Sequence, residues 1–308
     1  MVERTETDKH DRIRASCPVC NGDRQRNGRA VADHVTGRAD VFLAVECSDC
    51  GVVYIADPPS PSTIGSYYET FAGAAMHTAP NRLFRALRDR RFLSDVRPLL
   101  DRLPADSAVA DIGTGDGSLA DFLHRRGTPS IGVDLYPAAQ WRHPLIPYRQ
   151  VNLAVKAPSA EDLAGVGRPV RGAVMRHVLE HVHRPVDLLT GLRDAGISHI
   201  AVVVPNIESG FVTRFGSDWY YWDPPRHLTF FSSDTLGRTG EQAGFRVAWQ
   251  RTYGLDEVVT SLHRRSLLRR GPNRAATALR PTGMIAGAAS VLAAPFGRSV
   301  LHAVLEAR

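Results

Sequence analysis

The sequence predicts a doubly wound α/β sheet preceded by a small module that four cysteines hold together. Strand-like and helix-like segments alternate from residue 107 to residue 255, and this alternation is typical of a mostly parallel sheet with helices on both faces. All four cysteines lie in the first 50 residues. A chain of 308 residues is long enough to bury a core in one large domain or in two smaller ones.

The elements follow one another in a simple order. Residues 52–55 form a predicted strand, the prolines of residues 57–62 indicate a linker, and the apolar spacing of residues 81–103 predicts one helix or two. Glycine follows each of the helices predicted at 118–126, 185–195 and 233–243, and Pro185 begins the second of them. Proline is favoured at the first position of a helix and glycine just after its end. Further strands are predicted at residues 108–112, 130–135, 148–153, 170–178, 199–204, 245–252 and 300–306, and helices at 118–126, 185–195 and 233–243.

Composition and hydropathy exclude several classes of protein. Apolar residues make up 43% of the chain and charged residues 23%, which is typical of a globular protein and not of a disordered one. The longest apolar stretch, residues 284–296, is shorter than the roughly 20 residues that a membrane span needs. The charged N-terminus lacks the apolar centre of a secretory signal. We therefore expect a cytoplasmic protein whose thiols are not used for disulfides.

The cysteines form two pairs of the CxxC type, Cys17 with Cys20 and Cys47 with Cys50. Two such turns can direct four thiolates at one tetrahedral zinc, and four thiolates close its coordination sphere, as in structural sites. A redox role of the first pair is the alternative. Between residues 11 and 57 there are six arginines and seven acids, whereas a phosphate-binding face carries net positive charge. A zinc-stapled cap is therefore favoured over a nucleic-acid-binding ribbon.

A glycine-rich turn, DIGTGDG at residues 111–117, joins the first strand of the alternating region to the next helix. Such glycines let a ligand approach the backbone closely, and Asp134 at the end of the following strand can accept hydrogen bonds from ribose hydroxyls. The spacing differs from the GxGxxG of dinucleotide sites. Asp111 and Asp116 repel a pyrophosphate but suit a ligand that carries an ammonium and a sulfonium group. The turn therefore predicts S-adenosylmethionine as the cofactor.

With these motifs, residues 105–255 resemble a class I S-adenosylmethionine-dependent methyltransferase, whose sheet is Rossmann-like. The likeness is greatest to the subgroup that often carries an N-terminal zinc ribbon and includes sugar C-methyltransferases, and it extends over most of residues 15–255. The turn at residues 111–117 matches the first family motif. The other matching segments are residues 132–134 (GVD), 175–182 (MRHVLEHV), 204–206 (VPN), 224–228 (PPRHL) and 243–245 (AGF).

The resemblance implies roles for individual residues. Asp111 would reach the amino group of the methionine part, Asp134 would hold the ribose, and His177 would lie under the cofactor. Asn152 stands where the family often has an acid facing adenine, and its amide carbonyl would replace that acid. The other cofactor contacts expected are Gly113, Gly115, Gly117, Leu135 and Tyr68.

Two histidines and a tyrosine are the candidates for a catalytic base or for contact with the methyl acceptor: His181, His227 and Tyr221. An imidazole titrates near neutral pH and suits proton removal, although a purely structural role is the alternative for His181. Residues 177–181 also match the HxxEH pattern of zinc proteases, but they follow a strand and lack the helical context that this pattern needs. The aromatic run of residues 219–227 either lines a substrate pocket or packs as a cap.

The function expected from these features is methyl transfer from S-adenosylmethionine to O or C of a small molecule, such as a sugar, a polysaccharide precursor or a secondary metabolite. An RNA-base methyltransferase that grips RNA with its ribbon and a non-catalytic binding protein with this fold are the alternatives. The expected organisation is a zinc ribbon with a disordered N-terminus (1–58), a linker and helical cap (59–104), the cofactor-binding core (105–255), and a basic helical insertion with the final strand (256–308).

The net charge of +6 is located in one part of the chain. Residues 251–308 hold nine arginines and three acids, and the preceding residues are neutral in sum. Neither the ribbon nor the core is therefore expected to bind nucleic acid in general. The basic insertion is expected to be a solvated helical face, or alternatively an arm that touches an anionic membrane or a phosphate-bearing substrate.

Overall fold

The computed structural model describes residues 12–33, 36, 40–68, 82–137, 141, 143–254 and 298–308. Two compact units are formed, one from residues 1–72, 205–235 and 252–301 and the other from residues 73–204, 236–251 and 302–308. The expected disordered N-terminus and most of the basic insertion lie outside the described residues. No helix in the described part of the chain has both the length and the hydropathy that crossing a bilayer requires.

A seven-stranded sheet forms the centre of the second unit, in the order β10-β11-β8-β7-β4-β5-β6. Neighbouring strands from β8 to β6 run parallel, and the chain order reverses at β4, where open α/β sheets bind ligands beyond the carboxyl ends of their strands. This architecture confirms the doubly wound, Rossmann-like sheet that the sequence predicted. The strands are β4 (Ala108–Ile112), β5 (Ser130–Asp134), β6 (Tyr148–Gln150), β7 (Val170–Arg176), β8 (His199–Pro205), β10 (Phe245–Tyr253) and β11 (Val300–Ala307).

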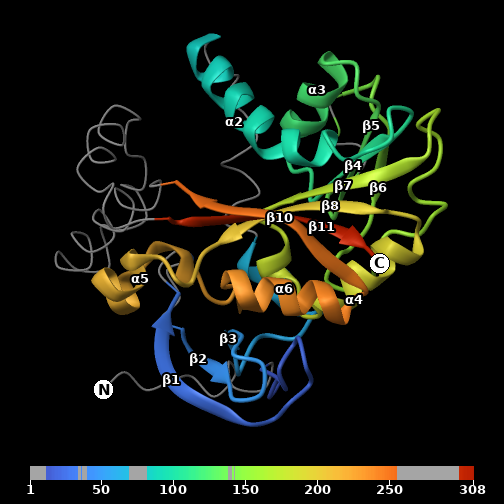
Figure 1. Ribbon diagram of the computed structural model, residues 1–308. Helices are drawn as coiled ribbons and strands as arrows, with labels where there is room; N and C mark the ends of the chain where they lie inside the picture. Colours follow the sequence, from blue (N-terminus) through green and yellow to red (C-terminus); the bar gives the residue numbers. More distant parts are fainter. Residues whose placement is uncertain are drawn as a thin grey trace. The chain divides into compact units, whose positions relative to one another are not determined.

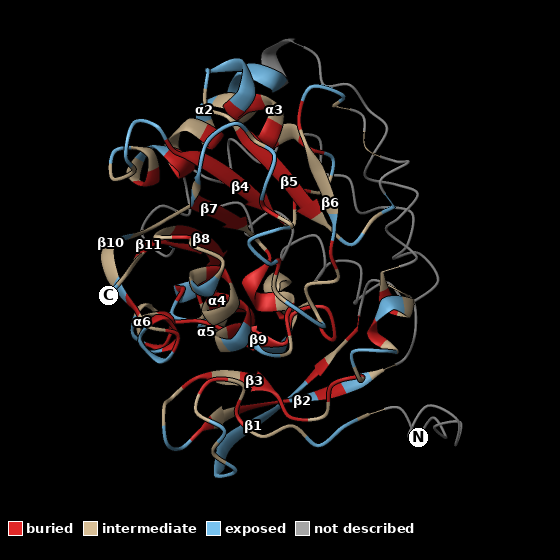
Figure 2. Ribbon diagram, turned by 90° about the vertical axis from the view of Figure 1, so that its right-hand side faces the viewer, coloured by how far each residue is buried: buried red, intermediate tan, exposed pale blue. Residues whose placement is uncertain are grey.

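Helices cover both faces of this sheet. Figure 1 shows α2 (Arg82–Leu100) and α3 (Ser118–Arg125) over one face, and α4 (Pro185–Asp194) and α6 (Ser233–Gln242) over the other. Apolar side chains of α2 and α3, such as Phe92, Val96 and Phe122, pack in one cluster with Val109 and Val174 of the sheet. Figure 2 shows β4 buried along its length and β5 buried up to its last residue, Asp134, which is partly exposed, as expected for strands that are covered on both faces.

Two predicted strands are shorter than expected, and each has a local reason. The strand predicted at residues 148–153 ends at Gln150, because Asn152 begins a turn: its carbonyl accepts hydrogen bonds from the N–H groups of Val155 and Lys156. The strand predicted at residues 170–178 ends at Arg176, because the backbone of His177 has φ +54°, which extended strands do not allow.

The first unit is built on a four-stranded antiparallel sheet in the order β1-β2-β3-β9. Its aromatic core joins residues that are far apart in the chain, including Phe42, Tyr67, Trp219, Trp222 and Phe230. The sequence predicted only β3, as residues 52–55. The strands are β1 (Gln25–Ala32), β2 (Val41–Cys47), β3 (Val53–Ile55) and β9 (Thr229–Phe230), and the helical segments are η2 (Ile64–Tyr67), α5 (Gly210–Phe215), η5 (Gly216–Asp218) and η6 (Tyr220–Trp222).

Candidate active site and cysteine cluster

The turn between β4 and α3 needs glycine at three positions, but for different reasons. All three glycines have positive φ, between +55° and +75°. A Cβ on Gly113 would lie 2.4 Å from a methyl carbon of Val178, and a Cβ on Gly117 would lie 2.6 Å from the ring of His143. A Cβ on Gly115 would meet no atom of the described residues within 4 Å. Gly115 is therefore the glycine at which a ligand can approach the backbone.

Asp111 is a buried carboxyl at the start of this turn. Its side chain accepts a hydrogen bond of 2.6 Å from the hydroxyl of Thr114, and the residue is 3% exposed. Burial raises the pKa of Asp111 to about 7, and the nearby Asp134 carboxylate acts in the same direction, whereas the Thr114 hydrogen bond opposes it. A cation placed beside Asp111 would favour its ionised form.

Asp134 ends β5 and faces the same turn. Its Oδ2 accepts a hydrogen bond of 2.8 Å from the Gly115 N–H, and its Oδ1 accepts one of 2.6 Å from the Leu135 N–H. Burial raises the pKa of Asp134, although these backbone hydrogen bonds oppose the rise. A carboxylate has about four lone-pair positions, so further hydroxyl donors can be bound. Leu135, beside it, is 49% exposed and offers an apolar surface to a flat ring.

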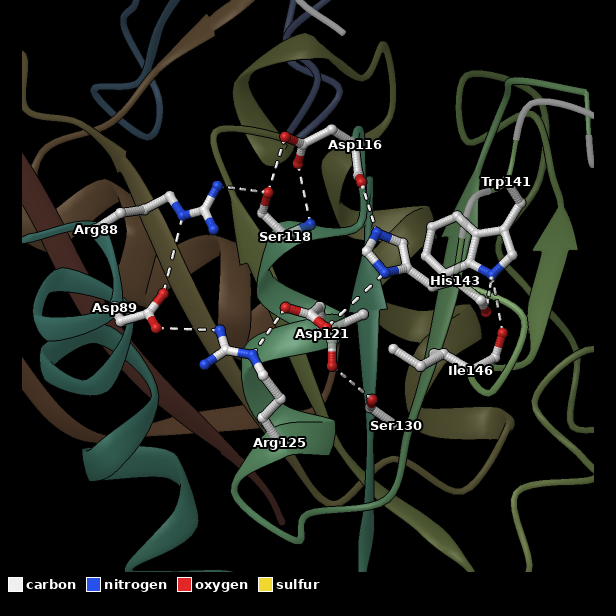
Figure 3. Close-up of polar contacts among 11 residues, drawn as sticks. Arg88, Asp89, Asp116, Ser118, Asp121, Arg125, Ser130, Trp141, His143 and Ile146 are labelled. Carbon is white, nitrogen blue, oxygen red and sulfur yellow. Dashed lines mark hydrogen bonds and ion pairs between the residues drawn. The ribbon is translucent and has the colours of Figure 1, made fainter. Parts of the chain in front are cut away.

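Asp116 was expected to face a cationic ligand, and the structure gives it another role. Figure 3 shows its carboxylate accepting hydrogen bonds from the backbone and the hydroxyl of Ser118, at 3.0 and 2.8 Å, so it caps the first turn of α3. The Asp116 carbonyl lies 3.1 Å from Nε2 of His143. The indole of Trp141 donates to the carbonyl of Ile146 at 2.9 Å. The side chains of Trp141 and His143, between β5 and β6, thus pack against the glycine turn at Gly117.

Three other predicted cofactor contacts lie in different surroundings. The side-chain carbonyl of Asn152 accepts a hydrogen bond of 3.0 Å from the Ala154 N–H, so the atom expected to face adenine already stabilises the turn after β6. His177 has its Nδ1 3.1 Å from a carboxylate oxygen of the buried Glu180. Tyr68 belongs to the first unit.

The three candidates for a catalytic base are divided between the units. His181 ends the short 3-10 helix η4 (Leu179–His181) of the second unit, so residues 177–181 do not form the regular helix that a zinc-protease motif requires. His227 and Tyr221 lie together in the first unit. Their rings stack with centroids 6.2 Å apart, and Nδ1 of His227 is 2.8 Å from the Tyr221 carbonyl. Buried His227 is thus held by the aromatic run.

Sequence reasoning missed a buried ionic group in the first unit. Arg226 pairs with Asp223 and lies 3.5 Å from the carboxylate of Asp33, and the side chains of Arg226 and Asp33 are 3% and 0% exposed. Asp33 directly follows β1, so this group connects the ribbon to the loop that carries His227. The PPRHL segment contains the arginine, but no local signal identifies Asp33 as its distant partner.

The four cysteines lie together, as the two CxxC pairs predicted. Cys17 and Cys50 have their sulfur atoms 3.5 Å apart, and so do Cys20 and Cys47; all four sulfurs lie within 4.8 Å of one another. A tetrahedral zinc with bonds of about 2.3 Å requires sulfur–sulfur edges of about 3.8 Å. The chemistry and spacing of these donors therefore fit one zinc ion.

Comparison with known protein families identifies the sheet-forming part of the chain. Residues 84–250, more than half of the sequence, match the family described as methyltransferase domain. No sequence among the curated proteins matches the chain.

Several solved structures are similar to this chain. A SAM-dependent methyltransferase from Archaeoglobus fulgidus shares 18% identity, covering 79% of this chain and 99% of that one with a TM-score of 0.46. The 1,6-didemethyltoxoflavin-N1-methyltransferase of Burkholderia thailandensis, solved with 1,6-didemethyltoxoflavin and S-adenosylhomocysteine, shares 12% identity, covering 85% and 98% with a TM-score of 0.46. A cyclopropane-fatty-acyl-phospholipid synthase-like protein from Lactobacillus casei shares 15%, covering 76% and 95% with a TM-score of 0.47. The family assignment rests on the match of residues 84–250 and not on these structures.

Proposed function

Since the chain belongs to the family of S-adenosylmethionine-dependent methyltransferases, we propose that it transfers the methyl group to an oxygen or carbon atom of a small molecule. A sugar, a polysaccharide precursor or a secondary metabolite is the substrate class that we favour, because residues 12–68 combine a cysteine cluster with nearly balanced charge and so lack a basic nucleic-acid face. The observation that supports this proposal most is the open space at Gly115 beside two carboxyls, the buried Asp111 and the partly buried Asp134.

In this proposal, each residue of the turn binds a different part of the cofactor. Asp111 holds the positive amino group, Asp134 accepts hydrogen bonds from the ribose, and Leu135 packs against adenine. The bound cofactor supplies a methyl group on a positively charged sulfur. The protein contributes mainly alignment of the acceptor with that methyl group, which can supply several kcal/mol.

A base is needed only if the acceptor atom carries a proton that must be removed. His227 is our first candidate, because its imidazole is held by Tyr221 through ring stacking and through its Nδ1 contact with the Tyr221 carbonyl. Tyr221 itself and His181 are the other candidates. We propose a structural role for the cysteine cluster, with one zinc held by Cys17, Cys20, Cys47 and Cys50.

Cofactor binding to the purified chain tests the proposal. We expect saturable binding of S-adenosylmethionine by calorimetry, weakened at least about tenfold in Asp111→Ala and in Asp134→Ala, because each change removes a charge-assisted contact. Asp187→Ala is the matched control, since this exposed acid lies on the surface of α4. Equal binding in all variants would contradict the assigned site.

A transfer assay tests the substrate class. With cofactor labelled in its methyl group, we expect label to appear in low-molecular-weight metabolites from an extract. Transfer to RNA instead would show that the small-molecule proposal is wrong.

A further inference from the structure

A hollow in the second unit lies between α2 and β10, and its lining is strongly basic. Its volume is about 390 Å³, which falls within the range of small-molecule sites. Among the described residues, Arg90, Arg97, Arg102 and Arg251 line it, with Asp101 as the single acid. None of the lining residues belongs to the glycine turn or to the segment after β5, so we treat this hollow, the α2–β10 groove, as separate from the cofactor site.

Helix α2 presents a row of positive groups to the α2–β10 groove. Arg90 and Arg97 are seven residues apart, which places them on one helix face about 10 Å from each other along the axis. Asp101, the acid named above, has an oxygen 3.7 Å from Nε of Arg97, and the side chains of Asp101 and Arg97 are 62% and 73% exposed. An exposed ion pair of this kind is weak, so Arg97 can turn to a stronger anionic partner.

The wall formed by β10 contributes a fixed guanidinium and an aromatic ring. Arg251 donates hydrogen bonds to the carbonyl and the hydroxyl of Ser94 on α2, at 2.9 and 2.6 Å, and its guanidinium lies 5.4 Å from the centre of the Trp249 ring. The Trp249 ring also packs edge-on against His302 at 4.8 Å. The two planar groups are therefore held in place before any ligand arrives.

We propose that the α2–β10 groove binds a nucleoside diphosphate or an organic diphosphate of similar size. Four guanidinium groups against one carboxylate complement a ligand with two or more negative charges, and their planar forks match phosphate oxygens. Trp249 is partly buried and lines the same groove, so the base of the ligand can stack on the part of its ring that faces the groove. In this proposal the protein binds a diphosphate ligand at a site separate from that of its methyl donor.

Calorimetry on the full chain tests this proposal with uridine diphosphate, inorganic pyrophosphate and uridine as probes. We expect uridine diphosphate to bind most tightly, pyrophosphate to bind more weakly and uridine not to bind. Binding should persist when S-adenosylhomocysteine is present in excess, because the two sites share no residue. Competition by S-adenosylhomocysteine would place the diphosphate in the cofactor site and overturn the proposal.

Substitutions test whether binding depends on the residues of the groove or only on the positive charge of the chain. Arg97→Gln and Arg251→Gln should each weaken uridine diphosphate binding by about tenfold or more, because each removes a charge-assisted contact to phosphate. Trp249→Leu should weaken uridine diphosphate but leave pyrophosphate unchanged. Arg85→Gln is the matched control, since Arg85 is an exposed arginine of the same helix and does not line the groove.

Three further results would refute the proposal. These are no saturable binding at millimolar uridine diphosphate, an equal loss in Arg85→Gln, and tighter, steeply salt-dependent binding of single-stranded RNA that displaces the diphosphate. The last would identify the groove as a nucleic-acid surface. Circular dichroism of each variant ensures that a loss of binding does not reflect a loss of fold.

Discussion

Asp111 is a carboxyl whose charge depends on what lies beside it. Burial raises its pKa from 3.8 to about 7, so in the ligand-free protein it is largely neutral below pH 7. A raised pKa means that the folded chain binds more protons than the unfolded chain, so the ionisation of Asp111 lowers the free energy of unfolding as the pH rises from about 4 to 7. A cationic ligand makes the ionised form of Asp111 the favoured one, because the positive charge binds to the carboxylate.

We therefore expect the affinity for S-adenosylmethionine to depend on pH. Below pH 7 each molecule bound must release the Asp111 proton, so affinity should fall by about tenfold per pH unit and should level off above pH 8. Calorimetry at pH 6, 7 and 8, in buffers of different ionisation enthalpy, measures both effects. Asp111→Asn should bind more weakly and lose this dependence, whereas Asp187→Asn should keep it. The same pH slope in Asp111→Asn would assign the titration to another group.

At this scale the sequence predicted which candidate residues meet at the glycine turn better than it predicted their surroundings. Asp111, Gly115 and Asp134 were candidates because of their types and spacing, and the structure places them at one turn. That Gly113 and Gly117 face protein side chains could not be predicted, because Val178 and His143 are brought to them only by tertiary packing. The helix-capping role of Asp116 could have been predicted from the local sequence, since a polar residue before a helix favours capping.

Strand β11 carries a histidine whose burial disfavours the charged form of the ring. His302 is fully buried, and burial lowers its pKa to about 4 although the carboxylate of Asp95 acts in the opposite direction. As the pH falls from 6.5 towards 4, the unfolded chain takes up a proton that the folded chain does not. The contribution of His302 therefore lowers the free energy of unfolding in acid, by at most about 3 kcal/mol at the lower end of this range.

Replacing this histidine should make the protein less sensitive to acid. In His302→Gln, which keeps a polar side chain that does not titrate, the free energy of unfolding by urea should fall less between pH 7 and pH 4.5 than in the parent chain. His124→Gln is the control, because His124 is exposed on α3 and its removal should leave the pH dependence unchanged. An identical acid loss in His302→Gln would mean that other groups cause it.

The elements of the sheet could be predicted wherever their signal is local. Buried strands such as β4 and β8 are apolar runs, and their ends lie within one residue of the prediction. Strand β1 escaped notice because six of its eight residues are exposed and show no apolar alternation. Strand β9 has only two residues and exists because it pairs with β3, which is a tertiary event that no short window of sequence reveals.

At the scale of the whole molecule, each unit is assembled from distant parts of the chain. The first unit places the cysteine cluster, the aromatic run and the loop of His227 on one core. The sequence predicted the cysteine cluster and the sheet as parts but assigned the aromatic run to the cofactor-binding segment, 105–255. Long-range pairs such as Arg226 with Asp33 determine the packing of this run, and they leave no pattern in the sequence.

This arrangement predicts that metal removal separates two properties of the protein. Cys47→Ser removes a buried ligand of the proposed zinc, and because metal binding is coupled to folding in such modules, the first unit should lose its structure. Asp111, Gly115 and Asp134 all belong to the second unit, so the dissociation constant for S-adenosylmethionine should change by no more than about twofold. Methyl transfer should fall by more than tenfold, because His227 and Tyr221 lie in the affected unit.

Three measurements on Cys47→Ser and on a matched Ser48→Ala variant check this separation: zinc per chain by atomic emission, cofactor affinity by calorimetry, and transfer of labelled methyl groups. The parent and Ser48→Ala should hold one zinc per chain and stay active. Much less than one zinc in the freshly purified parent would exclude the zinc centre. Loss of cofactor affinity in parallel with zinc would show instead that the two units fold as one, because a destabilised first unit would then disrupt the cofactor site as well.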